Sequence, residues 1–368
     1  MRTVVFFLVL GILSGCISPV NLDPSTPDRL IAVDGFISDQ EGPYEIIIHE
    51  ISRFAGTLQG GTEQFVTNAE VYITDQDGIR TDLTTAQLSR LEADCLSPPR
   101  IVNDVPSRGY FTPEGFRGEI GNTYTLHINT TDRSYVSTPQ TIVAGPEIDS
   151  VGYLYRRLPS TDPVVFGSGV DVFASWTDPV EARNFYSWRV NGIYRVDTPP
   201  VSGRCCPYFP DGNGMICWIN EQNVEGNRLA FSDDLINGNE VTERVGFIED
   251  NGLRFNNPVT PADRQYYVSI QQLSISGEAF AFYKLLESQL AISGSIFDPP
   301  PAALIGNMRN IDNPDENVIG FFGAFSIREK GTFINRNDLD FVQRYTDPCG
   351  DCRKMRWARL ETPQVFNE

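Results

Sequence analysis

Cysteine is the residue type in this chain whose chemistry depends most on its surroundings, and seven cysteines are present. Cys16 lies in a separate N-terminal motif, and six others remain: Cys95, Cys205, Cys206, Cys217, Cys349 and Cys352. An even number of cysteines favours disulfides when a chain is exported. Short spacing predicts that Cys217 pairs with Cys205 or Cys206, and that Cys349 pairs with Cys352, although several other pairings remain open.

The same thiols could instead serve a redox or metal site. Cys349-x-x-Cys352 has the spacing of a redox-active dithiol, and it could join Cys205, Cys206 and Cys217 in a zinc site. Both arrangements need free thiolates, which an oxidising compartment disfavours. Structural disulfides are therefore the favoured interpretation.

Few other side chains could perform acid–base or metal chemistry. The only histidines, His49 and His127, lie in predicted strands without a cysteine, an aspartate or a second histidine at ligand spacing. One turn offers oxygen atoms that could bind calcium, from Asp233, Asp234, Asn237, Asn239 and Glu240. Because turns favour these residue types for conformational reasons, we expect no metal and no other cofactor.

Enzyme signatures and a nucleic-acid-binding charge are both missing from the sequence. Neither a Gly-x-Ser-x-Gly nucleophile motif nor a glycine-rich phosphate loop occurs. The formal net charge is −19, and such a surface repels phosphate backbones. We therefore expect a protein that is not an enzyme and does not bind nucleic acid.

The N-terminus has the pattern of a lipoprotein signal. Arg2 precedes the apolar run 4–12, which is too short to span a bilayer and has the length of a signal-peptide core. Leu13-Ser14-Gly15-Cys16 then resembles the bacterial lipobox, in which the cysteine thiol accepts a diacylglycerol before cleavage. We expect residues 1–15 to be removed and Cys16 to carry lipid, including an acyl chain such as palmitate. The alternative is an ordinary cleaved signal followed by an incidental cysteine.

After this signal, the first half of the chain reads as a tether and a β-sandwich. Residues 16–28 contain three prolines and predict an extended, lipidated tether. The predicted strands are 30–37, 44–51, 69–74, 109–111, 121–128 and 134–137. Asp75-Gln76-Asp77-Gly78 predicts a hairpin turn, and 83–107 a loop that could hold a short helix. Short strands with regular turns are typical of an immunoglobulin- or transthyretin-like sandwich, here over 29–145.

Residues 146–368 read as a second, fibronectin-like β domain with one packed α-helix. Predicted strands lie at 148–153, 169–176, 184–190, near 245, at 267–270 and at 320–327. Trp176 is a candidate core anchor. Ser276 is a suitable N-cap for a helix over 277–292. Five residues recur at helical spacing and predict its packed face: Ala279, Phe282, Tyr283, Leu286 and Leu290.

An ordered series of motifs is similar to one known family. The series is the lipobox, Trp176-Thr177-Asp178-Pro179, Ser232-Asp233-Asp234-Leu235-Ile236-Asn237-Gly238, Phe297-Asp298-Pro299-Pro300, Gly306-Asn307 and Gly320-Phe321-Phe322. It resembles the Bacteroidetes outer-membrane lipoproteins catalogued as domain of unknown function 4249. The resemblance implies an outer-membrane lipoprotein, often encoded beside a TonB-dependent transporter. It carries over no catalytic residues.

These observations lead us to expect a lipid-anchored binding protein of the outer membrane. Its expected role is an accessory or binding subunit of a TonB-dependent transporter or a related complex, with the cell-surface side favoured over the periplasm. The alternative is a structural or assembly factor of the envelope without a small-molecule substrate.

The expected partner surface lies on the second domain. Three irregular segments, 199–220, 251–261 and 298–316, are rich in Pro, Gly and Asn, and long irregular segments are uncommon unless they bind something. Aromatic residues are favoured anchors at interfaces, so Tyr208, Phe209 and Trp218 are the predicted partner-binding residues. Phe255 is expected to be exposed with them. The alternative is that these rings cover the domain's own core.

Overall fold

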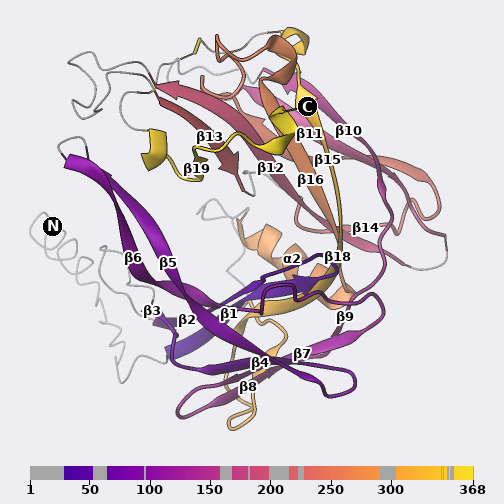
Figure 1. Ribbon diagram of the computed structural model, residues 1–368. Helices are drawn as coiled ribbons and strands as arrows, with labels where there is room; N and C mark the ends of the chain where they lie inside the picture. The colour runs from indigo at the N-terminus through magenta and orange to yellow at the C-terminus, as the bar shows by residue number, and fades with distance from the viewer. Residues whose placement is uncertain are drawn as a thin grey trace, which may run out of the picture.

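The structure is a computed structural model that describes residues 29–52, 64–94, 97–157, 168–180, 183–198, 215–222, 228–290, 304–340, 342, 344–345, 348 and 352–367. This part of the chain is mainly β and contains a single α-helix, α2. The predicted fold class is confirmed. The strands form one large sheet and a separate three-stranded sheet, and these two sheets build two sandwiches (Figure 1).

The first sandwich is made by the large sheet folding back on itself. Its strands are β1 (Arg29–Ser38), β2 (Glu45–Ser52), β3 (Gln64–Phe65), β4 (Glu70–Asp75), β5 (Arg80–Asp94), β6 (Ser97–Phe111), β7 (Thr123–Asn129), β8 (Ser134–Ser137), β9 (Gln140–Thr141) and β17 (Met308–Asn310). Alternate side chains enter one core, as shown by the full burial of Val33, Ile48 and Leu126 in three different strands. In this half of the molecule, every second side chain of a strand is thus buried in the core, as the alternation of apolar residues predicted.

The predicted turn between β4 and β5 is confirmed. Gly78 has a φ of 78°, a left-handed conformation that glycine adopts without a steric penalty. The side chain of Asp75 accepts hydrogen bonds from the backbone N–H groups of Asp77 at 3.0 Å and Ile79 at 2.8 Å. Local turn chemistry therefore determines this hairpin.

The expected loop at 83–107 is wrong, because this segment forms most of a long hairpin of β5 and β6. Pairing extends from Thr84 opposite Phe111 to Asp94 opposite Ser97, with three register shifts. Backbone pairing with the neighbouring strand overrides a weak local preference. The hairpin projects out of the first sandwich, and β5 contacts η4 (Cys352–Lys354) near the C-terminus.

The second sandwich packs the three-stranded sheet against one end of the large sheet. The smaller sheet contains β10 (Ile148–Arg156), β11 (Gly169–Thr177) and β15 (Glu240–Glu249). It faces β12 (Phe185–Thr198), β13 (Met215–Glu221), β16 (Tyr266–Ser274) and part of β18 (Ile319–Ile334). The shorter elements here are β14 (Phe231–Ser232), β19 (Ala358–Arg359), η2 (Ala262–Arg264), η3 (Arg336–Asp338) and η5 (Gln364–Phe366).

Trp176 is confirmed as a core anchor of this second sandwich. It lies on β11, is fully buried, and its ring centroid is 5.2 Å from that of Trp188 on β12. The two consecutive strands therefore lie in opposite sheets and meet through their indole rings. Truncating a buried ring of this size typically costs about 3–5 kcal/mol.

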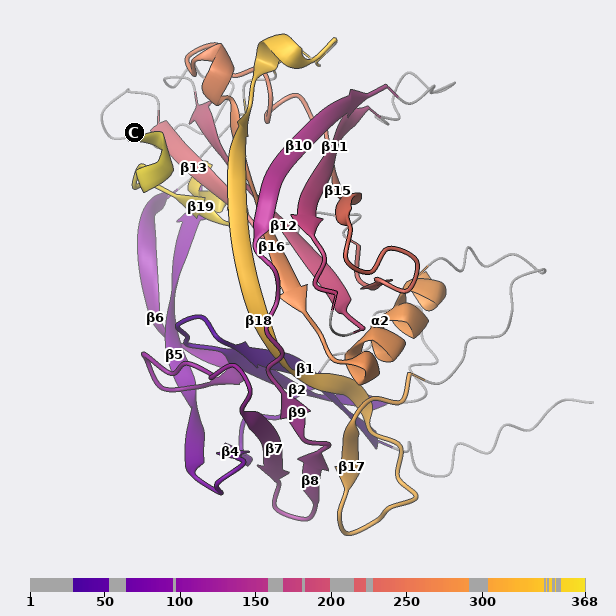
Figure 2. The same ribbon diagram turned by 90° about the vertical axis from the view of Figure 1, so that its right-hand side faces the viewer.

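Strand β18 joins the two sandwiches and runs through both of them (Figure 2). Its first part pairs in parallel with β1, and its second part pairs antiparallel with β16. Where it changes partner, buried Asp39 accepts a hydrogen bond from the Ile327 N–H at 2.8 Å and pairs with Arg328 at 2.7 Å. Residues 308–325 thus complete the first sandwich, although they follow the predicted boundary at residue 145. The division into domains 29–145 and 146–368 stays a prediction.

Helix α2 (Gly277–Leu290) lies where the two sandwiches meet. The N-cap is confirmed, because the Ser276 hydroxyl accepts a hydrogen bond from the Ala279 N–H at 3.1 Å. Ala279 is fully buried, and Phe282 packs on Phe321 of β18 with ring centroids 5.4 Å apart. Leu290 is exposed, so the packed face ends before the last turn. Residues 291 and 292 of the predicted helix lie outside the described residues.

Candidate partner-binding surface

Of the three predicted irregular segments, 251–261 borders one end of the second sandwich, and the described part of 298–316 lies elsewhere. Paired β12 and β13 lead into and out of segment 199–214, which lies outside the described residues. The last residues of predicted segment 199–220 belong to β13. Segment 251–261 lies beside β12, as its contacts below show. The third segment instead contributes β17, which pairs with β8 of the first sandwich.

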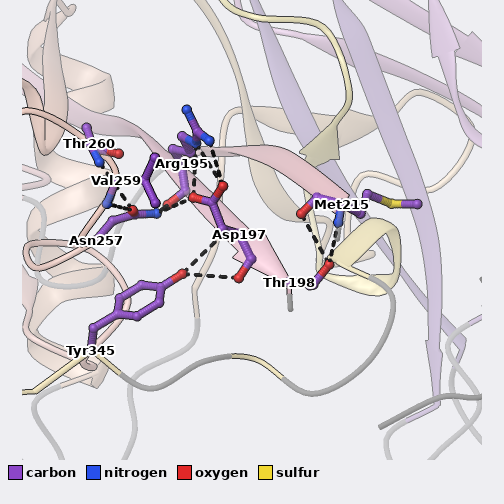
Figure 3. Close-up of polar contacts among 8 residues, drawn as sticks. All are labelled: Arg195, Asp197, Thr198, Met215, Asn257, Val259, Thr260 and Tyr345. Atoms are coloured by element: carbon purple, nitrogen blue, oxygen red, sulfur yellow. Dashed lines mark hydrogen bonds and ion pairs between the residues drawn. The ribbon is translucent and has the colours of Figure 1, made fainter. Parts of the chain in front are cut away.

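An ion pair on β12 forms the centre of this end of the sandwich (Figure 3). Arg195 and Asp197 are two residues apart, so their side chains point from the same face of the strand. The guanidinium donates to the Asp197 carboxylate at 2.6 Å from its terminal nitrogen and at 2.9 Å from Nε. This paired geometry directs the carboxylate toward segment 251–261.

Asn257 attaches segment 251–261 to that ion pair. Its Nδ2 donates to the carboxylate of Asp197 at 2.7 Å and to the backbone carbonyl of Arg195 at 3.0 Å (Figure 3). Its Oδ1 accepts from the N–H groups of Val259 and Thr260 at 2.9 and 3.3 Å. Every polar atom of this buried amide is therefore used, which holds the segment in one conformation.

Gln265 supports the same segment from the start of β16. Its Oε1 accepts from the Asn257 N–H at 2.8 Å, and its Nε2 donates to the Thr260 carbonyl at 2.6 Å. Tyr345 supports β12 from the C-terminal side, because its hydroxyl accepts from the Asp197 N–H at 3.2 Å (Figure 3). Two segments far apart in sequence thus meet on β12.

The disulfide in this region joins Cys217 to Cys352, 135 residues away in sequence. Both cysteines are buried, and their Cα atoms are 6.0 Å apart. The predicted pairings of Cys217 with Cys205 or Cys206, and of Cys349 with Cys352, are therefore wrong. Cys217 points from β13 into the core, where η4 brings Cys352 against it. Cys95, Cys205, Cys206 and Cys349 lie outside the described residues.

Trp218 and Phe255 are buried, so the expectation that these two rings are exposed is wrong. The Trp218 ring lies 4.4 Å from that of Phe366 in η5, which covers it. Phe255 packs on Tyr266 at 5.4 Å within the core of the second sandwich. Tyr208 and Phe209 lie outside the described residues, and their contact with a partner stays a prediction.

Other apolar side chains are exposed at this end, and the sequence analysis missed them. They are Ile216, Val259, Trp357 and Leu360. Ile216 pairs in register with Asp197, and Val259 follows two residues after Asn257. The alternation of β13 contained the signal for Ile216, because Cys217 and Ile219 face the core. Met215 on the other side of Ile216 also packs against that core, so the alternation of the strand directs Ile216 outward.

A buried ionic network joins segment 251–261 to β13. The Glu221 carboxylate accepts from the Tyr266 hydroxyl at 3.0 Å and pairs with Arg254 at 2.7 Å. Burial holds the pKa of Tyr266 well above its ordinary value, and the nearby Glu221 charge adds to this effect. Each charge is matched, which is the condition under which buried charges are tolerated.

The two histidines, which are the remaining candidates for acid–base or metal chemistry, make packing and hydrogen-bond contacts within the protein. His49 packs on Phe65 with ring centroids 4.8 Å apart. His127 stacks on Tyr72 at 4.6 Å and shares a hydrogen bond with the Thr74 hydroxyl at 3.0 Å. Burial lowers the pKa of His127, and the positive charge of Arg80 lowers it further. Both histidines thus occupy strand positions, as predicted.

The turn whose oxygen atoms were considered for calcium uses several of its polar side chains within the protein. Asp233 is buried and accepts from the Asn184 N–H at 2.8 Å, while Asp234 pairs with Arg183. The Asn239 amide donates to the Ile236 carbonyl at 2.9 Å. Among the residues that the structure describes, no group of three or more His, Cys, Asp or Glu side chains could hold a metal ion.

The structure thus defines a mainly β protein of two joined sandwiches. No helix in its described part is both long and apolar enough to cross a membrane. The chain belongs to the family described as Domain of unknown function (DUF4249), whose profile matches residues 17–331. The C-terminal segment that contains Cys352 and covers Trp218 therefore lies beyond the matched residues. No curated protein matches the chain.

Proposed function

We propose that the protein is an outer-membrane lipoprotein, anchored through Cys16, that acts as an accessory subunit of a TonB-dependent transporter or a related complex. The observation that carries the proposal is the surface at the end of β12 and β13, where Ile216 is exposed opposite Asp197 and Val259 is exposed on a rigidly bonded segment. Apolar side chains on a preorganised surface favour association, because little conformational entropy is lost on binding.

The proposed partner surface lies on a different sandwich from the one that follows the tether, which suits a protein held at the membrane by that tether. The tether precedes β1 in the first sandwich, whereas β12 and β13 lie in the second sandwich (Figure 1). The twelve residues from Ile17 to Asp28 could span about 40 Å when extended. Anchoring of both proteins in one membrane raises their local concentration, so a modest affinity is sufficient. We propose that the protein faces the cell surface.

The test is recovery of partners from gently solubilised outer membranes, identified by mass spectrometry. The variant Ile216→Ser/Val259→Ser removes two apolar side chains that are 45% and 60% exposed. The matched control Ile120→Ser/Ile79→Ser removes side chains of the first sandwich that are 47% and 65% exposed. We expect the wild type and the control to recover the transporter, and the first variant to lose it with unchanged thermal stability.

Two outcomes would reject parts of this proposal. Equal recovery by both variants would show that the partner does not bind at Ile216 and Val259. Recovery of assembly machinery or peptidoglycan in place of a transporter would favour the alternative function, a structural or assembly factor of the envelope.

A further inference from the structure

A pocket of about 440 Å³ lies on the first sandwich, away from the surface described above. The turn between β7 and β8 lines it on one side, and β3 with the residues after it lines the other. The residues that matter for its chemistry are Phe65, Asn68, Thr131, Asp132, Arg133 and Tyr135. Its volume falls within the range of small-molecule sites, which is roughly 300–1,000 Å³.

The walls of this pocket are held in place by contacts within the protein. In the β7–β8 turn, the Thr130 hydroxyl accepts from the Arg133 N–H at 3.1 Å and donates to the Asp132 carboxylate at 3.2 Å. On the opposite side, Phe65 contacts His49, with ring centroids 4.8 Å apart, and the guanidinium of Arg108 lies 5.1 Å from the Phe65 ring centroid. The pocket is therefore largely formed before any ligand arrives.

The charged side chains that line the pocket are Glu50, Asp132 and Arg133, and the cation among them is paired within the protein. Arg133 pairs with Glu316 at 3.0 Å, and the Tyr135 hydroxyl donates to the same carboxylate at 3.1 Å. Burial raises the pKa of Tyr135 to about 12, so its hydroxyl stays neutral. Asp132 is largely exposed to water and already accepts from Thr130. An anion would therefore find no unpaired cation here, and neither lining carboxylate, Asp132 or Glu50, is buried as the carboxylate of a dedicated cation site would be.

The remaining chemistry consists of neutral hydrogen-bonding groups beside an aromatic ring. The Thr131 hydroxyl can donate and accept, and the Asn68 amide offers two donors and one acceptor oxygen. Phe65 adds an apolar surface on the same wall. A ligand that fits must present many hydroxyl groups and one apolar C–H face. We propose that this pocket binds a neutral saccharide.

The test is titration of the purified protein with a panel of neutral oligosaccharides of glucose, xylose and N-acetylglucosamine, monitored by calorimetry. The variant Thr131→Trp places a large ring in the pocket from an exposed turn position. The matched control Asp77→Trp places the same ring in the exposed β4–β5 turn, outside the pocket. We expect at least one saccharide to bind saturably, with affinity reduced at least about tenfold by Thr131→Trp and unchanged by Asp77→Trp.

A second titration with neutral glycan released from the cell envelope distinguishes the source of the ligand. Binding of a soluble oligosaccharide supports capture from solution, and binding of the released glycan alone supports a ligand within the envelope. Failure of every saccharide to bind, or equal affinity of Thr131→Trp and wild type, would overturn the proposal. The variant Ile216→Ser/Val259→Ser should bind saccharide normally, so this result is independent of partner recovery.

Discussion

Cys217 and Cys352 show at the residue scale how a single bond can restrain a large part of the chain. The bond connects β13 to the C-terminal segment across 135 residues of sequence. In the chain-entropy account, a disulfide stabilises more when it closes a longer loop in the unfolded state. The observed pairing should therefore stabilise the fold more than the short-range pairings expected from sequence.

We predict that Cys217→Ala/Cys352→Ala lowers the free energy of unfolding by about 2–5 kcal/mol. Urea denaturation measured by tryptophan fluorescence gives this value. The comparison variant Cys349→Ala removes a cysteine that is three residues from Cys352 in sequence and does not belong to this bond. An unchanged midpoint in the double variant would contradict the observed pairing.

His127 provides a pH-dependent prediction at the same scale. Burial lowers the pKa of this imidazole below its ordinary value of about 6.5, so the folded state binds a proton less readily than the unfolded state. Its contribution is present above the unfolded pKa and is lost as the pH falls below about 6.5. We expect His127→Gln to reduce the loss of stability between pH 7 and pH 5. Parallel melting-temperature profiles for variant and wild type would show that His127 contributes nothing.

Strand β18 is the element on which the joining of the two sandwiches depends. It pairs with β1 and β16 in succession, so a change in its backbone affects both halves. Gly320 has a φ of 96°, and a Cβ at this position would overlap the backbone carbonyl of Val33 on β1. The close parallel pairing of β18 with β1 therefore requires glycine here.

We predict that Gly320→Ala destabilises the protein much more than Gly78→Ala does. Both glycines have positive φ, but open space surrounds a Cβ at Gly78. Gly78→Ala should therefore lower the free energy of unfolding only by the cost of a left-handed backbone conformation for alanine, about 1–2 kcal/mol. Gly320→Ala adds the overlap with β1, and we expect a loss above about 3 kcal/mol or a failure to fold. Equal losses of unfolding free energy in the two variants, measured by urea denaturation, would show that β1 and β18 can separate without cost.

The whole molecule combines a predicted signal at its N-terminus with two joined sandwiches. Cys16 lies outside the described residues, and its lipidation stays a prediction. Lipid attachment would place the first sandwich, and the pocket beside β3, near the membrane, because the tether enters the fold at β1. The surface at Ile216 and Val259 belongs to the second sandwich.

We predict that Cys16→Ala yields a soluble or unprocessed protein that incorporates no labelled fatty acid. The thiol of Cys16 is the proposed acceptor of the lipid, so no other cysteine should replace it. Membrane fractionation with metabolic lipid labelling measures both effects. Cys95→Ala is the control and should remain membrane-bound and labelled. A labelled, membrane-bound Cys16→Ala product would exclude the lipid-anchor prediction.

Features decided by neighbouring residues could be predicted from the sequence. The strand at Ser134–Ser137, the turn before Gly78, the N-cap Ser276 and the anchor Trp176 all follow from alternation, turn chemistry or helix capping. These signals extend over a few residues, so the sequence alone determines them. The mainly β class of the fold follows from the same patterns.

The tertiary structure decided which distant segments meet. The pairing of β18 with β1, the bond from Cys217 to Cys352, and the cover of Phe366 over Trp218 each join residues far apart in the chain. The same is true of the pocket, whose walls come from β3 and the β7–β8 turn. A strand's alternation shows that it has a buried face, but it does not show which strand or ring will cover that face, because burial in any complementary core satisfies the same hydrophobic pattern.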